Sequence, residues 1–141
     1  PAQQLTEMLI GERSGELRVG VYAPKDKPEA PWLTLRGALS RSLFAGWVED
    51  QQTNENIDFE QRSGSDSFIS LKEMVGNGLG RCILPHCIAR HDPRLVVQEH
   101  DLPFSGVPLW VASHVDLRDS PRLRGVRKRL AEMLRTHPDL M

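Results

Sequence analysis

The sequence has few of the features that mark a secreted or membrane-spanning protein. Of its 141 residues only two are cysteine, Cys82 and Cys87. Two cysteines do not make the disulfide framework of a small secreted domain, which favours a reduced, cytosolic compartment. We find no charged-then-apolar leader and no apolar run near the ~20 residues that a membrane-spanning helix needs. The chain begins with Pro1 and not with Met, which predicts a processed protein or a piece of a longer one.

An excess of charge of one sign is also missing. Lys and Arg number 18 and Asp and Glu number 19, so the net charge is −1. A chain with this balance has no global field that draws it to nucleic acid or to a membrane surface. Its 39% hydrophobic content is ordinary for a globular protein, and its length predicts one domain with a real core.

The clearest pattern that is present runs from residue 64 to residue 85. Ser65 or Asp66 is predicted to cap a helix, because its side chain accepts hydrogen bonds from first-turn N–H groups. Apolar residues then recur at helical spacing: Phe68, Leu71, Met74 and Val75. Gly76 and Gly78 are predicted to end this helix at positive φ. The apolar run of residues 82–84 predicts a short strand buried on both faces, which Pro85 ends.

The rest of the chain alternates between predicted strands and helices. Strands are predicted at residues 17–23, 43–47, 57–61 (with Ile57 and Phe59 inward), 95–97 and 107–112. Helices are predicted at residues 34–39 (with Thr34 as cap), 87–89, and from Pro121 to His137. Ser120 and Pro121 open that last helix, and its apolar stripe is Leu123, Val126, Leu130 and Leu134. Residues 1–14, with Leu5, Met8 and Leu9, fit a helical turn or an extended lead-in, and residues 49–55 fit a surface excursion. The alternation favours a layered α/β domain.

An ordered series of motifs carries a family resemblance. The helix, glycine turn, strand and Leu-Pro ending of residues 65–85 come first. They are followed by DPRL at 92–95, PLWV at 108–111 and HVDLRDSPR at 114–122. In this order the chain resembles the effector-binding domain of LysR-type bacterial transcriptional regulators, most specifically over residues 64–136.

The resemblance implies an architecture of two α/β lobes joined by two crossover strands, as in periplasmic-binding-protein-like folds. On this template residues 1–114 are the second lobe, and residues 115–141 return to the first lobe as its terminal helix. Residues 17–23 and 107–112 would form the antiparallel pair at the hinge. The rest of the first lobe and the DNA-reading helix-turn-helix are not among these residues.

Motifs for catalysis, cofactors or metal binding are weak. The order helix, glycines, strand is the reverse of a nucleotide-binding loop, so Gly76, Gly78 and Gly80 predict a tight turn. Ligand types also gather at close spacing: Cys82, His86, Cys87 and His91. They lack a zinc-finger spacing, and Cys82 is expected to point into the core. No nucleophile elbow is present, so we predict no enzyme, no cofactor and no metal site.

A set of cations near the end of the chain raises the possibility of nucleic-acid contact: Arg118, Arg122, Arg124, Arg127, Lys128, Arg129 and Arg135. No aromatic residues interleave them for stacking on bases. They fit the polar side of an amphipathic helix, so a solvated charged face is the better interpretation.

The turn at residues 64–68 has the best functional signal. Backbone N–H groups, the Ser65 and Ser67 hydroxyls and a helix dipole converge there and attract a carboxylate or phosphate. An ordinary capped helix is the alternative. The resemblance implies that this turn is the second lobe's part of an effector site. The candidate effector-binding residues are Gly64, Ser65, Asp66, Ser67, Phe68 and Pro85. Asp66 opposes an anion if it points into the site.

These observations predict sensing of a small, acidic molecule by a cytoplasmic regulator, with no membrane contact and with DNA bound only through an absent N-terminal domain. The alternatives are a solute-binding protein of bilobal fold and a small enzyme on the same fold. Without the rest of the first lobe, the stripe of Leu123, Val126, Leu130 and Leu134 lacks a partner surface. We therefore expect self-association.

Overall fold

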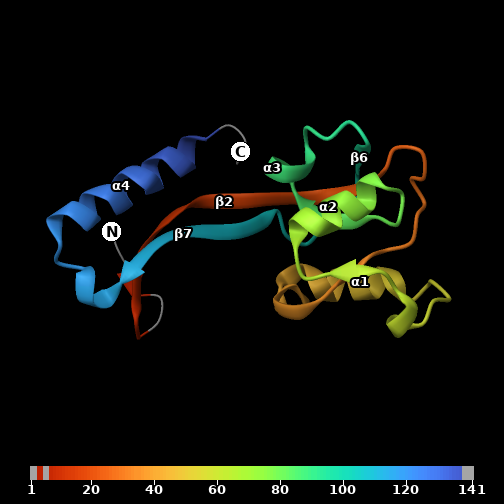
Figure 1. The fold of residues 1–141 in the computed structure, drawn as a ribbon, viewed down its shortest axis with the longest axis horizontal. Coiled ribbons are helices and arrows are strands. Elements are labelled where there is room, and N and C mark those ends of the chain that lie inside the picture. The colour runs from red at the N-terminus through yellow and green to blue at the C-terminus, as the bar shows by residue number, and fades with distance from the viewer. Residues whose placement is uncertain (1–2, 5–6, 138–141) are drawn as a thin grey trace. The chain divides into compact units, whose positions relative to one another are not determined.

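The computed structural model describes residues 3–4 and 7–137, apart from the side chains of residues 3, 4 and 59. Figure 1 shows its elements. The strands are β1 (Gln3–Gln4), β2 (Leu9–Pro24), β3 (Thr34–Leu35), β4 (Gly64–Ser65), β5 (Cys82–Pro85), β6 (Leu95–Gln98) and β7 (Gly106–His114). The helices are α1 (Leu43–Gln52), α2 (Phe68–Gly76), α3 (His86–Ala89) and α4 (Pro121–Thr136), with short 3-10 turns η1 (Gly37–Arg41), η2 (Phe59–Gln61) and η3 (Val115–Leu117).

The chain divides into two compact units, residues 1–18 with 106–141, and residues 19–105. Strand β2 is shared, since it begins in the first unit and continues into the second. In the first unit β2 pairs with β7 from Leu9 opposite His114 to Arg18 opposite Gly106, antiparallel. The predicted pair of residues 17–23 with residues 107–112 is antiparallel but displaced, because residues 107–112 lie opposite residues 11–17 and only Leu17 of the predicted segment is among them. Residues 19–24 of β2 pair with other strands. The predicted assignment of residues 1–114 and 115–141 to two lobes stays a prediction.

In the unit of residues 19–105, β2 is flanked by β5 and β6, both antiparallel to it. Strands β3 and β4 pair in parallel, with Thr34 opposite Gly64. A parallel bridge between Trp32 and Arg81 joins the segment before β3 to the start of β5. Strands β3, β4 and β5 therefore run in one direction, and their carboxyl ends share one edge.

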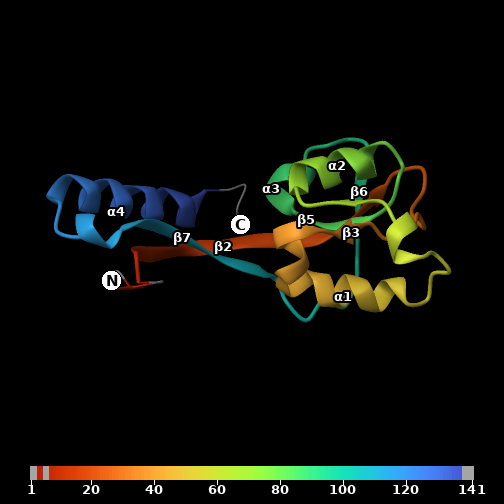
Figure 2. The same ribbon diagram turned by 60° about the horizontal axis from the view of Figure 1, so that its bottom comes forward.

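Helices cover both faces of these strands: α2 lies on one side and α1 on the other (Figure 2). All four residues of β5 are buried, as predicted for a strand covered on both faces. Large core side chains at most 1% exposed come from β2, β5, both helices and the segment before β3: Val21, Leu33, Val48, Leu71, Val75, Ile83 and Leu84. The predicted strand at 95–97 and the helical turn at 87–89 are also confirmed as β6 and α3.

The predicted strand at residues 43–47 is wrong, because this run is the first half of α1. The buried residues of α1 are Phe44, Ala45, Val48 and Gln52, which share one helical face. Gln52 holds its place in the core by donating to the backbone oxygen of Leu33 at 3.4 Å and to Thr34 Oγ1 at 3.1 Å. The surface excursion predicted at residues 49–55 is likewise helical up to Gln52.

Two further local predictions are corrected. Thr34 lies in β3 and opens no helix, although the 3-10 turn η1 follows at Gly37. Residues 57–61 are not a strand, since η2 begins at Phe59. Ile57 is 37% exposed and does not point inward, and the side chain of Phe59 lies outside the described part of the structure. At the other end of the chain, Leu9 begins β2, so the extended alternative holds for residues 9–14, while Leu5 lies outside the described residues.

Helix α4 begins as predicted, with the Ser120 hydroxyl accepting from the Leu123 N–H and Pro121 in the first turn. It packs on β7 through Arg127 and Ala131, which are buried, and through the half-buried Leu123 and Leu134. The other half of the predicted stripe is exposed, with Val126 at 49% and Leu130 at 41%. Arg127 is an exception to the predicted solvated face, because its Nη1 donates to Ser113 Oγ at 2.9 Å. Among the described residues, no helix is long and apolar enough to cross a membrane.

Candidate functional site

The candidate site lies at the edge where the parallel strands β3 and β4 end. Gly64 stands so close to Thr34 that a Cβ on it would lie 2.9 Å from the Thr34 Cβ and closer still to the Thr34 backbone oxygen. At the next step of the edge, Arg36 N donates to the Ser65 backbone oxygen at 2.9 Å. The close approach of the two strands therefore requires glycine at position 64, and the chain leaves the sheet after Ser65.

Gly37 and Asp66 meet where these strands leave the edge. Gly37 has φ +57°, and a Cβ on it would lie 2.9 Å from the Asp66 Cβ. Gly37 was not predictable as a site residue, because the sequence pattern predicts a helix over residues 34–39. In the structure Gly37 follows β3 after one residue, Arg36. The Asp66 side chain is exposed.

Ser67, and not Ser65 or Asp66, is the N-cap of α2. Its hydroxyl oxygen accepts from the Ser70 N–H at 3.3 Å, and the Ser65 hydroxyl oxygen accepts from the Ser67 N–H at 3.2 Å. Both serine oxygens therefore serve the turn itself, and their hydroxyl hydrogens stay available as donors. The N–H groups of Phe68 and Ile69, in the first turn of α2, donate to no acceptor within the part of the chain that the structure describes. Four donors are thus gathered at the positive end of a helix dipole.

The remaining predicted site residues differ in exposure. Phe68 is half-buried, and its ring centroid lies 6.5 Å from that of Phe44, which in turn lies 4.9 Å from that of Phe104. Pro85 is buried and pairs with Val19 at the carboxyl end of β5. The structure thus brings residues 64–68 into one turn, while Pro85 ends a neighbouring strand of the same unit.

The C-terminal end of α2 is followed by a glycine turn, as predicted. Only one of the two glycines predicted to have positive φ does so. Gly78 has φ +81°, while Gly76 remains within the helix. The N–H groups of Gly78 and Leu79 donate to Val75 and Met74, both at 3.0 Å. These two bonds therefore satisfy carbonyl groups at the end of α2, which agrees with the predicted tight turn.

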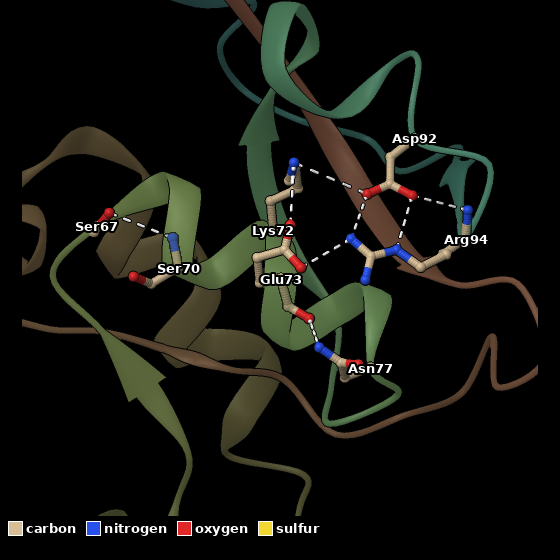
Figure 3. A network of polar contacts seen from close by, with 7 residues as sticks. All are labelled: Ser67, Ser70, Lys72, Glu73, Asn77, Asp92 and Arg94. Carbon is tan, nitrogen blue, oxygen red and sulfur yellow. Dashed lines mark hydrogen bonds and ion pairs between the residues drawn. The ribbon is translucent and has the colours of Figure 1, made fainter.

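A network of charged side chains ties the later turns of α2 to the loop before β6 (Figure 3). The Arg94 guanidinium donates to both carboxylate oxygens of Asp92, at 2.7 and 3.0 Å, and to Glu73 at 3.0 Å. Lys72 lies 3.3 Å from Glu73. The hydrogen bonds from Arg94 lower the pKa of Asp92 to about 2, and those from Arg94 and Lys72 lower the pKa of Glu73. The carboxylates of this network are occupied by protein cations, so we assign it a structural role.

The four residues considered as metal ligands, Cys82, His86, Cys87 and His91, differ in their exposure to solvent. Cys82 is fully buried, and desolvation raises the pKa of its thiol to about 12. His86 Nδ1 lies 2.7 Å from the Tyr22 hydroxyl, and His91 is exposed. Among the described residues no group of three or more His, Cys, Asp or Glu is arranged to hold a metal ion.

Comparison with known proteins bears on this geometry. The profile of the LysR substrate binding domain family matches residues 13–135. A search of curated proteins gave no match. The regulatory domain of Synechocystis CcmR, solved in complex with 2-PG, has 15% identity, a TM-score of 0.65, and coverage of 97% of this chain and 73% of that one.

Longer solved chains are also similar. HinK, a LysR family transcriptional regulator from Pseudomonas aeruginosa, has 16% identity, a TM-score of 0.61, and coverage of 94% of this chain and 51% of that one. A full-length variant of OxyR from the same organism has 20% identity, a TM-score of 0.63, and coverage of 95% and 53%. The present chain therefore spans about half the length of these two regulators.

The fold is that of the regulatory domains of LysR-type regulators, an α/β fold of the periplasmic-binding-protein-like kind. The chain belongs to the LysR substrate binding domain family. The predicted family and fold class are confirmed.

Proposed function

We propose that this chain is the effector-sensing part of a LysR-type transcriptional regulator and that it works by binding a small molecule, without catalysis. The observation that carries the proposal is the match of the LysR substrate binding domain family over residues 13–135. The CcmR regulatory domain of the same fold was solved with 2-PG bound, which supports small-molecule binding here. In this mechanism the effector changes the populations of two domain arrangements, since it binds one of them more tightly.

The effector, in this proposal, binds at residues 64–68 through an anionic group. The support is chemical: the Ser65 and Ser67 hydroxyls and the N–H groups of Phe68 and Ile69 are donors at a helix N-terminus. Each interaction of an anion with the dipole contributes about 0.3–1 kcal/mol at an exposed site. Tight binding therefore needs further contacts from other parts of the domain. Asp66 is exposed beside these donors and disfavours effectors of high negative charge.

Two variants separate anion binding from folding. Ser67→Asp keeps a good N-cap but adds a negative charge among the donors, so the helix stays capped and anion binding is lost. Ser65→Ala removes one hydroxyl donor. Ser63→Ala is the matched control, because Ser63 is exposed and adjoins β4.

The measurement is nuclear magnetic resonance titration of the 141-residue chain with small carboxylates, phosphate and 2-PG, which detects weak binding. We expect amide shifts centred on residues 65–69 in the wild type and in Ser63→Ala, and their loss in Ser67→Asp. Shifts that centre elsewhere, or that persist in Ser67→Asp, would remove this turn from the site.

In the whole protein we propose that DNA is bound by a separate N-terminal domain outside residues 1–141, and that the regulator acts in the cytoplasm, where its promoter DNA lies. We assign residues 1–114 to the second lobe and residues 115–141 to the first, with Pro85 contributing to the same site as residues 64–68. Self-association through α4 is the remaining part of the proposal. It is supported by three exposed apolar side chains on one face of α4, at Val126, Leu130 and Met133.

A further inference from the structure

A cluster of three aromatic rings lies beside α1, in the unit of residues 19–105 and apart from the proposed effector site. The His100 ring centroid is 5.6 Å from that of Trp32 and 5.6 Å from that of Trp47, and the two indoles are 5.3 Å apart. All three pairs meet edge to face, at 72–83°. Trp32 is only 3% exposed, while Trp47 and His100 are half-buried. Such packing favours a neutral imidazole, because charge is costly among apolar rings.

The hydrogen bonds around His100 define which of its nitrogens carries the proton. Gln98 Nε2 donates to the Pro28 backbone oxygen at 2.6 Å, which directs Gln98 Oε1 toward the cluster. That oxygen lies 3.2 Å from His100 Nε2 and accepts from Arg81 Nη1 at 3.4 Å. Since an amide oxygen only accepts, His100 Nε2 must be the donor, and the neutral ring carries its single proton there.

A second proton would go to Nδ1, where the cluster does not suit it. In the part of the chain that the structure describes, no protein acceptor is recorded for His100 Nδ1. Arg81 directly precedes β5, and its guanidinium lies 4.4 Å from the Trp32 ring centroid. Its positive charge disfavours protonation of His100. Burial first, and then Arg81, lower the pKa of His100.

The other neighbours do not offset this cation. The segment before β3 presents the Trp32 ring, α1 presents Trp47, and β6 presents the uncharged Gln98. Glu99 and Asp101 adjoin His100 in the chain, and both are exposed to water. Their interaction with His100 is therefore screened.

His100 lies in the connection between β6 and β7, residues 99–105. This connection is held on the α1 side at two points, by His100 against Trp47 and by Phe104 against Phe44. At its end, the Ser105 backbone oxygen accepts from the Val19 N–H at 3.0 Å, just where β2 and β7 meet. Loss of the His100 contact would free one of the two aromatic anchors of the segment that leads into β7.

We propose that His100 is a pH-sensitive latch: neutral His100 holds residues 99–105 on α1, and protonation in acid releases this segment. The released ring titrates near its ordinary pKa of 6.5, while the packed ring titrates lower. Release is therefore favoured as the pH falls below about 6.5 and is absent well above it.

The test follows the His100 ring by nuclear magnetic resonance from about pH 8 to about pH 5, with amide protection of Leu102 as a second readout. The Leu102 N–H donates to the His100 backbone oxygen at 3.0 Å. In the wild-type chain we expect a His100 midpoint below 6.5, with loss of Leu102 protection over the same pH range. His100→Phe keeps an aromatic ring without the charge and should abolish this loss. Arg81→Gln removes the facing cation and should move the midpoint up toward 6.5.

His91→Phe is the control, since His91 is an exposed histidine of the same unit, and it should leave the transition unchanged. A His100 midpoint at or above 6.5 in the wild type would overturn the latch, and this result needs no variant to fold. Loss of Leu102 protection that persists in folded His100→Phe would overturn it equally.

Discussion

At the scale of single residues, Gly64 is the position of the candidate site that tolerates substitution least. A Cβ there would press on the Thr34 backbone oxygen and lie 2.9 Å from the Thr34 Cβ. We predict that Gly64→Ala lowers the free energy of unfolding by about 1–3 kcal/mol, the usual cost of overpacking, because β3 and β4 must separate. Urea unfolding measures it.

Gly46 provides the matched control for this substitution. It lies within α1, is exposed, and has no atom within 4 Å of an added Cβ. Gly46→Ala should therefore raise the free energy of unfolding, by about 0.5–1 kcal/mol, through helix propensity alone. Equal effects of the two substitutions would contradict the close approach of β3 and β4.

Asp92 gives a residue-scale prediction about pH. Its pKa is lowered from 3.8 to about 2, chiefly by the hydrogen bonds from Arg94. A lowered carboxylate pKa contributes stability that is present above about 3.8 and is lost as the pH falls through about 2. In Arg94→Gln the Asp92 pKa should rise toward 3.8, and the stability difference from wild type should shrink over this pH range.

Carboxyl resonances of Asp92, recorded through an acid titration, measure this shift directly. Lys25→Gln is the charge-matched control, since it also removes one exposed cation from the same unit. An Asp92 pKa that stays near 2 in Arg94→Gln would show that Arg94 is not the cause.

At the scale of elements, the N-cap residue of α2, Ser67, is also part of the candidate site. The Ser67 hydroxyl accepts from the Ser70 N–H, so Ser67→Ala should cost about 1 kcal/mol in the free energy of unfolding. Asp66 is exposed and makes no cap bond to α2, so Asp66→Ala should stay within about 0.5 kcal/mol of wild type. Thermal or urea unfolding of the two variants distinguishes them, and the reverse order would restore Asp66 as the cap.

The elements that were predictable from sequence are those with a complete local pattern. Ser120 and Pro121 begin α4, and the uninterrupted apolar run of β5 is buried on both faces. The apolar run at the start of α1 wrongly predicts a strand, because it is short and short apolar runs do not separate buried helix from buried strand. Its helical period continues to Gln52, a polar residue whose burial depends on hydrogen bonds to the neighbouring strand. Such bonds are tertiary and have no local signal.

The candidate site shows the same limit. The small residues before an amphipathic helix were enough to predict a donor-rich turn at residues 64–68. The identity of the cap was not predictable, because Ser65, Asp66 and Ser67 are all good N-cap residues and the helix start differs by one or two positions among them. Gly37 depends on the pairing of β3 with β4, which lie about thirty residues apart in the chain. Long-range pairing of two-residue strands leaves almost no trace in sequence.

At the scale of the whole molecule, the feature that bears on self-association is an exposed apolar face of α4. Val126, Leu130 and Met133 are 49%, 41% and 53% exposed and recur at the spacing of one helical face. A contiguous apolar face is rarely left in water, so we predict that the 141-residue chain self-associates through α4. Leu130→Glu should weaken this association about tenfold or more, because reburying part of a leucine contributes about 1.4 kcal/mol.

Sedimentation velocity over a range of protein concentrations measures this association. Leu117→Glu is the control, since Leu117 is 46% exposed but lies in η3, outside α4, so it makes the same chemical change at similar exposure. We expect wild type and Leu117→Glu to associate alike, and Leu130→Glu to move toward the monomer. A wild-type chain that sediments as a monomer at the highest concentration would disprove the prediction. Equal weakening by both substitutions would show that added negative charge, and not the α4 face, controls association.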